Sequence, residues 1–320
     1  KLITSGRYEI YNTGHPQEDY FNMYRIDDKS DLKEAVLYVD YKTNIREHNM
    51  AAAGREAGCG FSKSFVESFL CSDGLPISLS NKYLGDETMR KETANRDPRL
   101  KQLILTNDFP TNVTDDLKDS TFVVNEDEFI TQHCFTGYRP IKGFNPIYSQ
   151  ALYMKSSFDG IAYRYAETLL INAEAKAELN TITNADLDRT VNQLRDRVGM
   201  PHLTVNVGFT DPKWPDWGYS LSPVLQEIRR ERCIELAGEG FRFNDLKRWK
   251  AGKLLNNVLT YVGKRKPDGN LAIVYPNYTN PDLSYQAGKS RTWEDKMYLY
   301  PIPTGELQRN PQLLPQNPGW

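Results

Sequence analysis

Residues 223–250 constrain the fold more than any other stretch, because they place charged side chains inside an apolar stripe. At about 3.6 residues per turn, one face of a helix here carries the apolar side chains Val224, Leu225, Ile228 and Leu236. The same face carries Arg232, Glu235 and Glu239. Charges in apolar surroundings are costly unless they are paired and hydrogen-bonded. The segment therefore predicts a helix whose charges find partners inside the protein.

Glycines end this helix, and a second helical run follows it. Gly238 and Gly240 suit a helix C-terminus, because glycine readily adopts the left-handed conformation. The second run adds Arg242, Asp245, Arg248 and Trp249. We interpret the acids and arginines as a structural ion-pair network at a helical corner, in which Arg232 reaches Glu235 one turn away. The alternative is a catalytic pair of Glu235 and Glu239, but nearby arginines keep carboxylates ionised and unsuited to proton donation.

A second strong pattern predicts an αα-hairpin. Within residues 162–179 one narrow stripe carries Ala162, Ala166, Leu169, Leu170, Ala173 and Ala177. Alanines allow a partner helix to approach closely, and we expect that partner at residues 185–198. Thr183 and Asp186 suit a capping box at its start, and Gly199 suits its end.

Other segments give weaker predictions. Alternating, β-branched sequence predicts strands at residues 35–41, 103–105, 121–124 and 129–135, and helical spacing predicts a helix at residues 251–262. Five prolines in the last 23 residues exclude a long helix there. We expect this tail to lie extended over the body, with Trp320 as an anchor.

Composition excludes several classes of protein. Lys and Arg (40) nearly balance Asp and Glu (42), which gives no support to nucleic-acid binding. No apolar run is long enough to span a bilayer. The cysteines lack metal-ligand spacing, so no cofactor or metal is expected. The sequence does not decide whether Cys59 and Cys71 form a disulfide. The acidic stretch 114–119 is either a solvated loop, which we favour, or a calcium site.

Aromatic rings in loops are the candidate ligand contacts. Sugars present apolar CH faces, which pack on exposed Trp and Tyr rings beside polar groups. A proline-broken loop carries Trp214, Trp217 and Tyr219, and a later loop carries Tyr275, Tyr278 and Tyr285. The alternative is that these rings pin their loops to the helical body.

Seven motifs, in order, resemble the SusD/RagB family of outer-membrane nutrient-binding lipoproteins of Bacteroidetes. They are FLCSDGLPI (69–77), NRDPRL (95–100), TGYRPIK (136–142), YRYAETLLINAEAKAE (163–178), VNQLRDRVGMP (191–201), EIRRERCIELAGEGFRFNDLKRWK (227–250) and YLYPIPTGELQRNPQLLPQNPGW (298–320). The resemblance covers residues 69–320 as the family's C-terminal domain. Residues 1–68 match only loosely, as the end of an N-terminal helical region whose earlier part is absent from this chain.

The resemblance implies a mostly α fold, with tetratricopeptide-like helical hairpins, long loops and a few short strands. It implies a non-catalytic protein on the cell surface, anchored in the outer membrane by a lipidated N-terminal cysteine that this chain does not contain. Such a protein captures oligosaccharide and passes it to a SusC-like TonB-dependent transporter barrel. A peptide-binding member of the family is one alternative, and a glycoside hydrolase using paired carboxylates is another.

Overall fold

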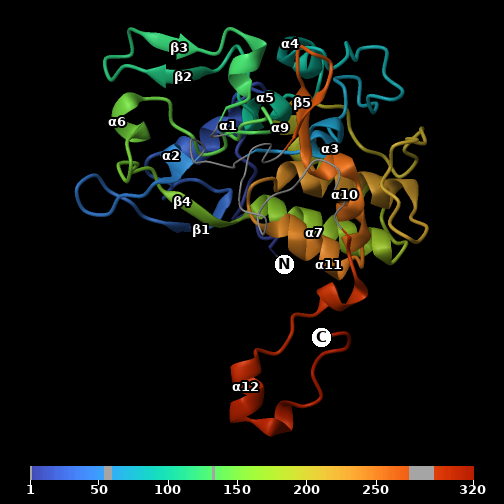
Figure 1. Ribbon diagram of the computed structural model, residues 1–320. Coiled ribbons are helices and arrows are strands. Elements are labelled where there is room, and N and C mark those ends of the chain that lie inside the picture. Colours follow the sequence, from blue (N-terminus) through green and yellow to red (C-terminus); the bar gives the residue numbers. More distant parts are fainter. Residues whose placement is uncertain (1, 54–59, 132–133, 274–291) are drawn as a thin grey trace.

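The computed structural model describes residues 2–53, 60–131, 134–273 and 292–320 (Figure 1). Helices exceed strands among the regular elements of these residues, and the strands form three two-stranded antiparallel sheets. The α-helices are α1 Asp19–Asn22, α2 Met50–Ala53, α3 Lys63–Glu67, α4 Met89–Thr93, α5 Arg99–Leu103, α6 Tyr148–Ala151, α7 Tyr165–Glu178, α8 Asn184–Asp188, α9 Val191–Arg197, α10 Pro223–Glu235, α11 Phe241–Arg248 and α12 Thr304–Arg309. The strands are β1 Ala35–Val39, β2 Pro110–Val113, β3 Ser120–Phe122, β4 Gly160–Arg164, β5 Val262–Arg265 and β6 Leu271–Ile273. None of the described helices has the length and apolar character that crossing a membrane requires.

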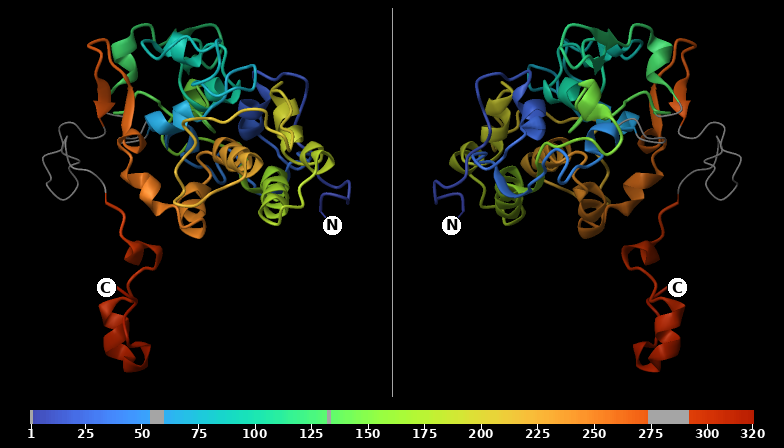
Figure 2. Two further views of the ribbon diagram at one scale, coloured as in Figure 1. Left: turned by 90° about the vertical axis from the view of Figure 1, so that its right-hand side faces the viewer. Right: turned by 90° about the vertical axis from the view of Figure 1, so that its left-hand side faces the viewer.

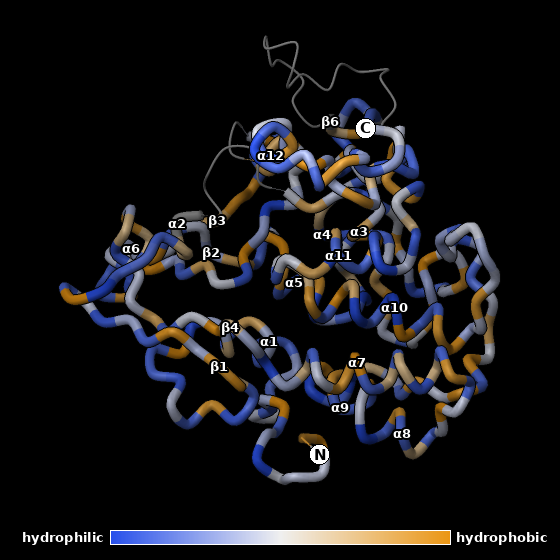
Figure 3. Tube along the Cα trace, turned by 90° about the horizontal axis from the view of Figure 1, so that it is seen from below, coloured by the Kyte–Doolittle hydropathy of each residue, from blue (hydrophilic) through white to orange (hydrophobic). Residues whose placement is uncertain are grey.

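The long helices α7 and α10 form the main helix pair, and hydrophobic and hydrophilic residues interchange along both (Figure 3). Pro223 occupies the start of α10, where its missing N–H and fixed φ suit a helix. Gly240, with φ of 84°, separates α10 from α11 as the glycine pattern predicted. The corner is therefore set by local sequence.

The predicted αα-hairpin is confirmed only in part. Residues 185–198 form two helices, α8 and α9, because the Thr190 hydroxyl donates to the Asp186 carbonyl at 2.6 Å and competes with helix continuation. The capping box of Thr183 and Asp186 is present. α7 starts at Tyr165, later than expected, and it packs against α10 as well as α9.

α10 contributes side chains to two separate hydrophobic clusters. Ile234 joins a cluster that includes Tyr20, Phe69 and Leu100. Val224, Leu225 and Ile228 join the second cluster, with residues of α7 and α9. Because α10 contributes to both clusters, we call this helix the common wall of both cores.

β1 pairs antiparallel with β4, with Ala35 opposite Arg164. The strand predicted at 35–41 is thus confirmed. Arg164 is both the last residue of β4 and the N-cap of α7. This junction directs its buried guanidinium toward the glutamates of α10 and the loop that follows it.

Three other predictions from local pattern were wrong. Residues 99–103 are the helix α5, and Ile104 forms only an isolated bridge to Pro140. Of the strand predicted at 129–135, Phe129 ends a 3-10 helix and Thr131 forms only an isolated bridge to Cys134, while residues 132 and 133 lie outside the described residues. The strand predicted at 121–124 is confirmed in part by β3. Residues 251–262 form two 3-10 turns, Gly252–Asn256 and Val258–Thr260, before β5 begins. In each case the apolar run was short, and such runs do not distinguish a strand from a helix.

The tail does not lie over the body as expected. Residues after 300 project from it (Figures 1 and 2), and they fold on themselves. Gln316 bonds both the N–H and the carbonyl of Ile302, at 2.8 and 2.9 Å. Trp320 does act as an anchor, but its indole donates to the carbonyls of Lys296 and Leu299 within the same segment.

Candidate functional site

A buried group of charges, here named the central ion-pair network, occupies the corner that α10 forms. Five carboxylates face five cations, so the charges balance. The carboxylates are Glu34, Asp97, Glu231, Glu235 and Glu239, and the cations are Arg99, Lys142, Arg164, Arg195 and Arg197. They come from six segments that are distant in sequence.

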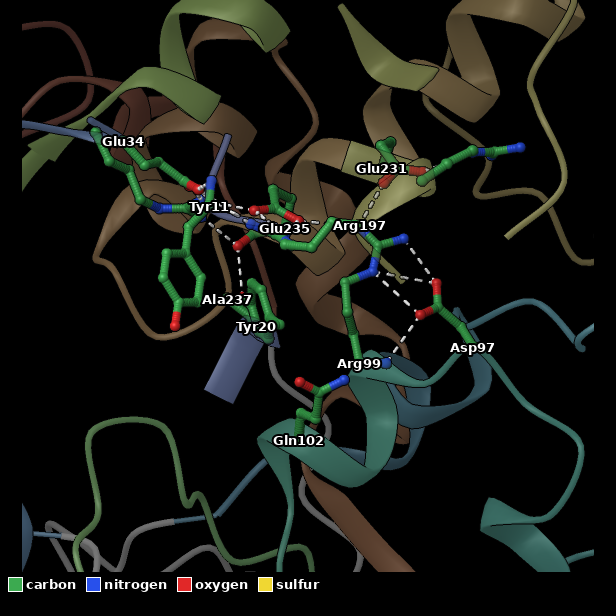
Figure 4. Close-up of polar contacts among 12 residues, drawn as sticks. Tyr11, Tyr20, Glu34, Asp97, Arg99, Gln102, Arg197, Glu231, Glu235 and Ala237 are labelled. Atoms are coloured by element: carbon green, nitrogen blue, oxygen red, sulfur yellow. Dashed lines mark hydrogen bonds and ion pairs between the residues drawn. The ribbon is translucent and has the colours of Figure 1, made fainter. Parts of the chain in front are cut away.

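Glu235 lies at the centre of the network and is fully buried. Arg197 donates to both of its oxygens at 2.7 Å (Figure 4). Arg164 and Arg99 donate to one oxygen each, at 2.6 and 3.0 Å. Burial raises the pKa of Glu235, but the guanidinium groups of Arg197, Arg164 and Arg99 outweigh burial and hold the pKa well below its usual range. The carboxylate stays ionised and cannot act as a general acid near neutral pH.

Glu239 lies at the outer edge of the network. Arg164 donates to it at 2.7 and 2.8 Å, and the Lys142 ammonium donates at 2.6 Å. Burial raises the pKa of Glu239, but Arg164 and Lys142 together lower the pKa to about 2. The hollow at the α10–α11 corner is lined by Cys233, Phe241 and neighbouring residues, and neither Glu235 nor Glu239 is among them.

The lowered pKa of Glu239 predicts a pH dependence of stability. A carboxylate whose folded pKa lies below its unfolded value, about 4.3, stabilises the fold above that value and loses this contribution as pH falls toward about 2. We expect Glu239→Gln to be less stable than wild type at pH 6, by an amount on the order of 3 kcal/mol. Urea unfolding from pH 6 to 2.5 should show this gap closing. A gap that stays constant would contradict the assignment.

A second charged group joins α10, α11 and α7. Arg232 pairs with Asp245 at 2.9 Å, and not with Glu235 as the helical spacing suggested. Arg248 also donates to Asp245 and forms a two-bond pair with Glu174. The Trp249 indole donates to Glu174 as well, at 2.6 Å. Arg242, which the sequence placed in this network, is exposed and stands 5.9 Å from the centre of the Trp249 ring.

The aromatic loop before α10 is tied to that helix. The Trp214 indole donates to Glu227 at 2.7 Å and the Trp217 indole to Gln226 at 2.6 Å. Trp217 is only 6% exposed and packs edge-on against the Trp249 ring. Its ring belongs to a small core cluster, so a ligand cannot stack on it. We therefore no longer propose Trp217 as a ligand contact.

Trp214 and Tyr219 keep more accessible rings. Trp214 is half-buried, and Tyr219 is 44% exposed. The Tyr219 hydroxyl donates to the Trp249 carbonyl at 2.7 Å, which fixes the ring at the surface. Among the described members of the predicted contact set, these two have rings that a ligand can reach.

The remaining candidates divide between described and undescribed residues. Tyr275, Tyr278 and Tyr285 lie outside the described residues, as does Cys59. Cys71 is a buried free thiol. In the stretch 114–119, Asp116 accepts from Thr114 and pairs with Lys118. No cluster of three or more His, Cys, Asp or Glu side chains suited to a metal occurs in the described part of the chain.

Local sequence reasoning missed most members of the central ion-pair network. Arg99 follows Asp97 and Pro98 in the motif NRDPRL, where no apolar stripe signals that the side chain is buried. Arg195 and Arg197 lie on one helix with Val191 and Leu194, where charges beside an apolar face signalled burial in the same way as in α10.

The comparisons with known proteins agree with this architecture. The chain matches the family model described as the SusD family over residues 11–320. It is 33% identical over 166 residues to SusD-like protein P2 of Formosa agariphila, covering 52% of this chain and 27% of that protein. A crystal structure of a SusD-like protein from Bacteroides fragilis matches with a TM-score of 0.68 at 25% identity, covering 98% of this chain and 59% of that one. A SusD-like carbohydrate binding protein of the same species gives 0.64 at 23% identity, covering 96% and 58%.

The class is that of a helix-rich scaffold with a few two-stranded sheets, as in the solved SusD-like proteins. The chain belongs to the SusD family. Proteins of this family are binding proteins that catalyse no reaction. The cations that hold Glu235 and Glu239 ionised make both unsuited to the proton donation that a catalytic pair requires. The chain spans only about three fifths of the solved relatives.

Proposed function

We propose that the chain is the C-terminal part of a cell-surface protein that captures oligosaccharide for uptake. The observation that carries this proposal is the match to the SusD family along residues 11–320. Similar folds occur in a SusD-like carbohydrate binding protein of Bacteroides fragilis and in surface glycan-binding protein A of Bacteroides fluxus. We further propose that the whole protein passes its ligand to a SusC-like TonB-dependent transporter barrel, and that a lipidated N-terminal cysteine anchors it in the outer membrane.

The scaffold of this proposal is the helical layer of α7 to α10. We propose that α7 with α8 and α9 is one tetratricopeptide-like hairpin. The division into residues 1–68 and 69–320 stays a prediction. Residues of the two ranges contact each other. The hydroxyl of Tyr20, in α1, donates to the Glu235 carbonyl, and β1 pairs with β4.

We place ligand contacts in the aromatic loop before α10, at Trp214 and Tyr219. Their rings are partly exposed, and hydrogen bonds to Glu227 and Trp249 hold them in place. Rigid aromatic rings at a surface suit the apolar faces of sugars. Tyr275 and Tyr278 stay proposed contacts from composition alone.

Calorimetric titration of the purified chain with panels of oligosaccharides and peptides tests the function. We expect heat of binding with at least one oligosaccharide, and Trp214→Ala should weaken that affinity about tenfold, the effect of one lost ring contact. Trp320→Ala removes an exposed ring in the projecting tail and is the matched control. If the chain binds peptides and no oligosaccharide, the ligand class is peptide and the proposal of a glycan ligand is wrong. No binding to either would overturn the proposal.

A further inference from the structure

A pocket of about 330 Å³ lies between the N-terminal segment, the start of α7 and α9. Its size falls at the low end of small-molecule sites, about 300–1,000 Å³. The polar and aromatic residues that line it are Tyr8, Glu9, Asn12, Tyr165, Gln193 and Asp196. The aromatic loop before α10 contributes no residue to this pocket.

Two tyrosines form the aromatic wall of the pocket. The rings of Tyr8 and Tyr165 are stacked, with centroids 6.0 Å apart and planes inclined by 28°. Tyr165 is only 3% exposed and its ring belongs to the core cluster of α7, α9 and α10, so the half-buried Tyr8 ring is the one that a ligand can reach. Within the described residues neither tyrosine hydroxyl has a hydrogen-bond partner. Burial raises the pKa of Tyr165, so its hydroxyl stays protonated and can donate to a ligand.

Contacts with the central ion-pair network hold the N-terminal segment that carries Tyr8 in place. The Glu9 N–H donates to the Lys33 carbonyl at 3.4 Å, and the Tyr11 N–H donates to a Glu34 oxygen at 2.8 Å. Glu34 itself pairs with Arg164, the residue that precedes Tyr165. Both tyrosines are thus positioned from the same buried charges, and the pocket is formed before any ligand arrives.

Side-chain amides and carboxylates surround these rings. Asn12 accepts from the Gly14 N–H through its oxygen, which leaves its amide hydrogens for a ligand. Gln193 donates to the Arg189 carbonyl, which leaves its oxygen to accept. Glu9 and Asp196 are exposed carboxylates, and no Lys or Arg lines the pocket. Glu9 pairs with Lys33, and Asp196 contacts His202.

We infer that this pocket is a subsite for a neutral sugar unit. The half-buried Tyr8 ring, fixed by its contact with Tyr165, suits the apolar face of a sugar, and the free amide and hydroxyl groups suit its hydroxyls. Because no lysine or arginine lines the pocket, a uronic or sulfated sugar finds no counter-charge there, and the Asp196 carboxylate disfavours it further. The inference rests on the proposed function, which it deepens by naming a second contact site and the charge class of its ligand.

The test compares wild type with Tyr8→Ala, Tyr8→Phe and Trp214→Ala by calorimetry. The probes are neutral gluco-, manno-, galacto- and xylo-oligosaccharides and, as acidic counterparts, oligogalacturonides. We expect wild type to prefer a neutral probe, Tyr8→Ala to bind it about tenfold more weakly, and Tyr8→Phe to bind nearly as well as wild type. Asp196→Asn should bind oligogalacturonides more tightly than wild type does. Circular dichroism melting shows whether each variant is folded.

The outcomes separate the two proposals. If Trp214→Ala weakens binding and a folded Tyr8→Ala does not, glycan capture stands and the subsite is overturned. A wild-type preference for oligogalacturonides also overturns the subsite. If wild type binds no oligosaccharide, the proposed function fails and the subsite fails with it. Should Tyr8→Ala be unfolded, Asp196→Asn decides, because its side chain is exposed; unchanged affinity for oligogalacturonides would overturn the inference.

Discussion

Replacing Glu235 by glutamine is expected to destabilise the protein by about 3–5 kcal/mol, the range for breaking one partner of a buried ion pair. Glutamine has nearly the same shape, so no cavity forms. The change removes the charge that Arg99, Arg164 and Arg197 share, and it leaves three buried guanidinium groups with too few counter-charges. Urea unfolding followed by circular dichroism measures the loss.

The matched control for this variant is Glu306→Gln. Glu306 pairs with Arg309 on the exposed helix α12, where an ion pair contributes at most about 1 kcal/mol. The control should therefore unfold at nearly the wild-type urea concentration. If Glu235→Gln were as stable as this control, the central ion-pair network would not be what holds the helical corner together.

Replacing Trp217 by alanine should cost a similar amount, about 3–5 kcal/mol, because a large buried ring leaves a cavity. The ring packs edge-on against Trp249 at 5.4 Å, and the Arg229 guanidinium lies 4.8 Å from its centre. Its indole N–H also donates to Gln226, which the variant leaves without that donor. The thermal unfolding midpoint measures the effect.

Tyr153→Ala is the control for Trp217→Ala. Its ring is 75% exposed, so truncation leaves no cavity and the midpoint should stay close to that of wild type. A small effect of Trp217→Ala, equal to that of the control, would show that the ring is free at the surface. It would then return to the set of ligand contacts.

The sequence predicted what depends on neighbours in the chain. Pro223 and the glycines at 238 and 240 set the ends of the helices at the corner, and the Thr183 capping box starts α8. The charged face of α10 indicated buried partners for Glu235 and Glu239. The pattern did not identify these partners, because Arg99, Arg164 and Arg197 lie in segments that are distant from α10 in sequence. Helical spacing suggested Arg232 as the partner of Glu235, because such spacing relates only residues within one helix.

The aromatic loop shows the same limit. Prolines and three rings predicted a loop with aromatic side chains, and that is where the rings lie. Which ring is buried depends on the residues that α10 and α11 present to the loop. Gln226 and Trp249 enclose Trp217, whereas Tyr219 lies where its hydroxyl reaches the Trp249 carbonyl and its ring stays exposed. Spacing within the loop carries no information about those contacts.

The shared wall that α10 forms has a consequence for the order in which the protein folds. Arg99, Arg164 and Arg197 are all made before Glu231, Glu235 and Glu239. Without the α10 segment, the three guanidinium groups would keep only Glu34 and Asp97 as counter-ions in the same small volume. We therefore expect the residues before α10 to lack a closed interior on their own, and both hydrophobic clusters to close once α10 is in place.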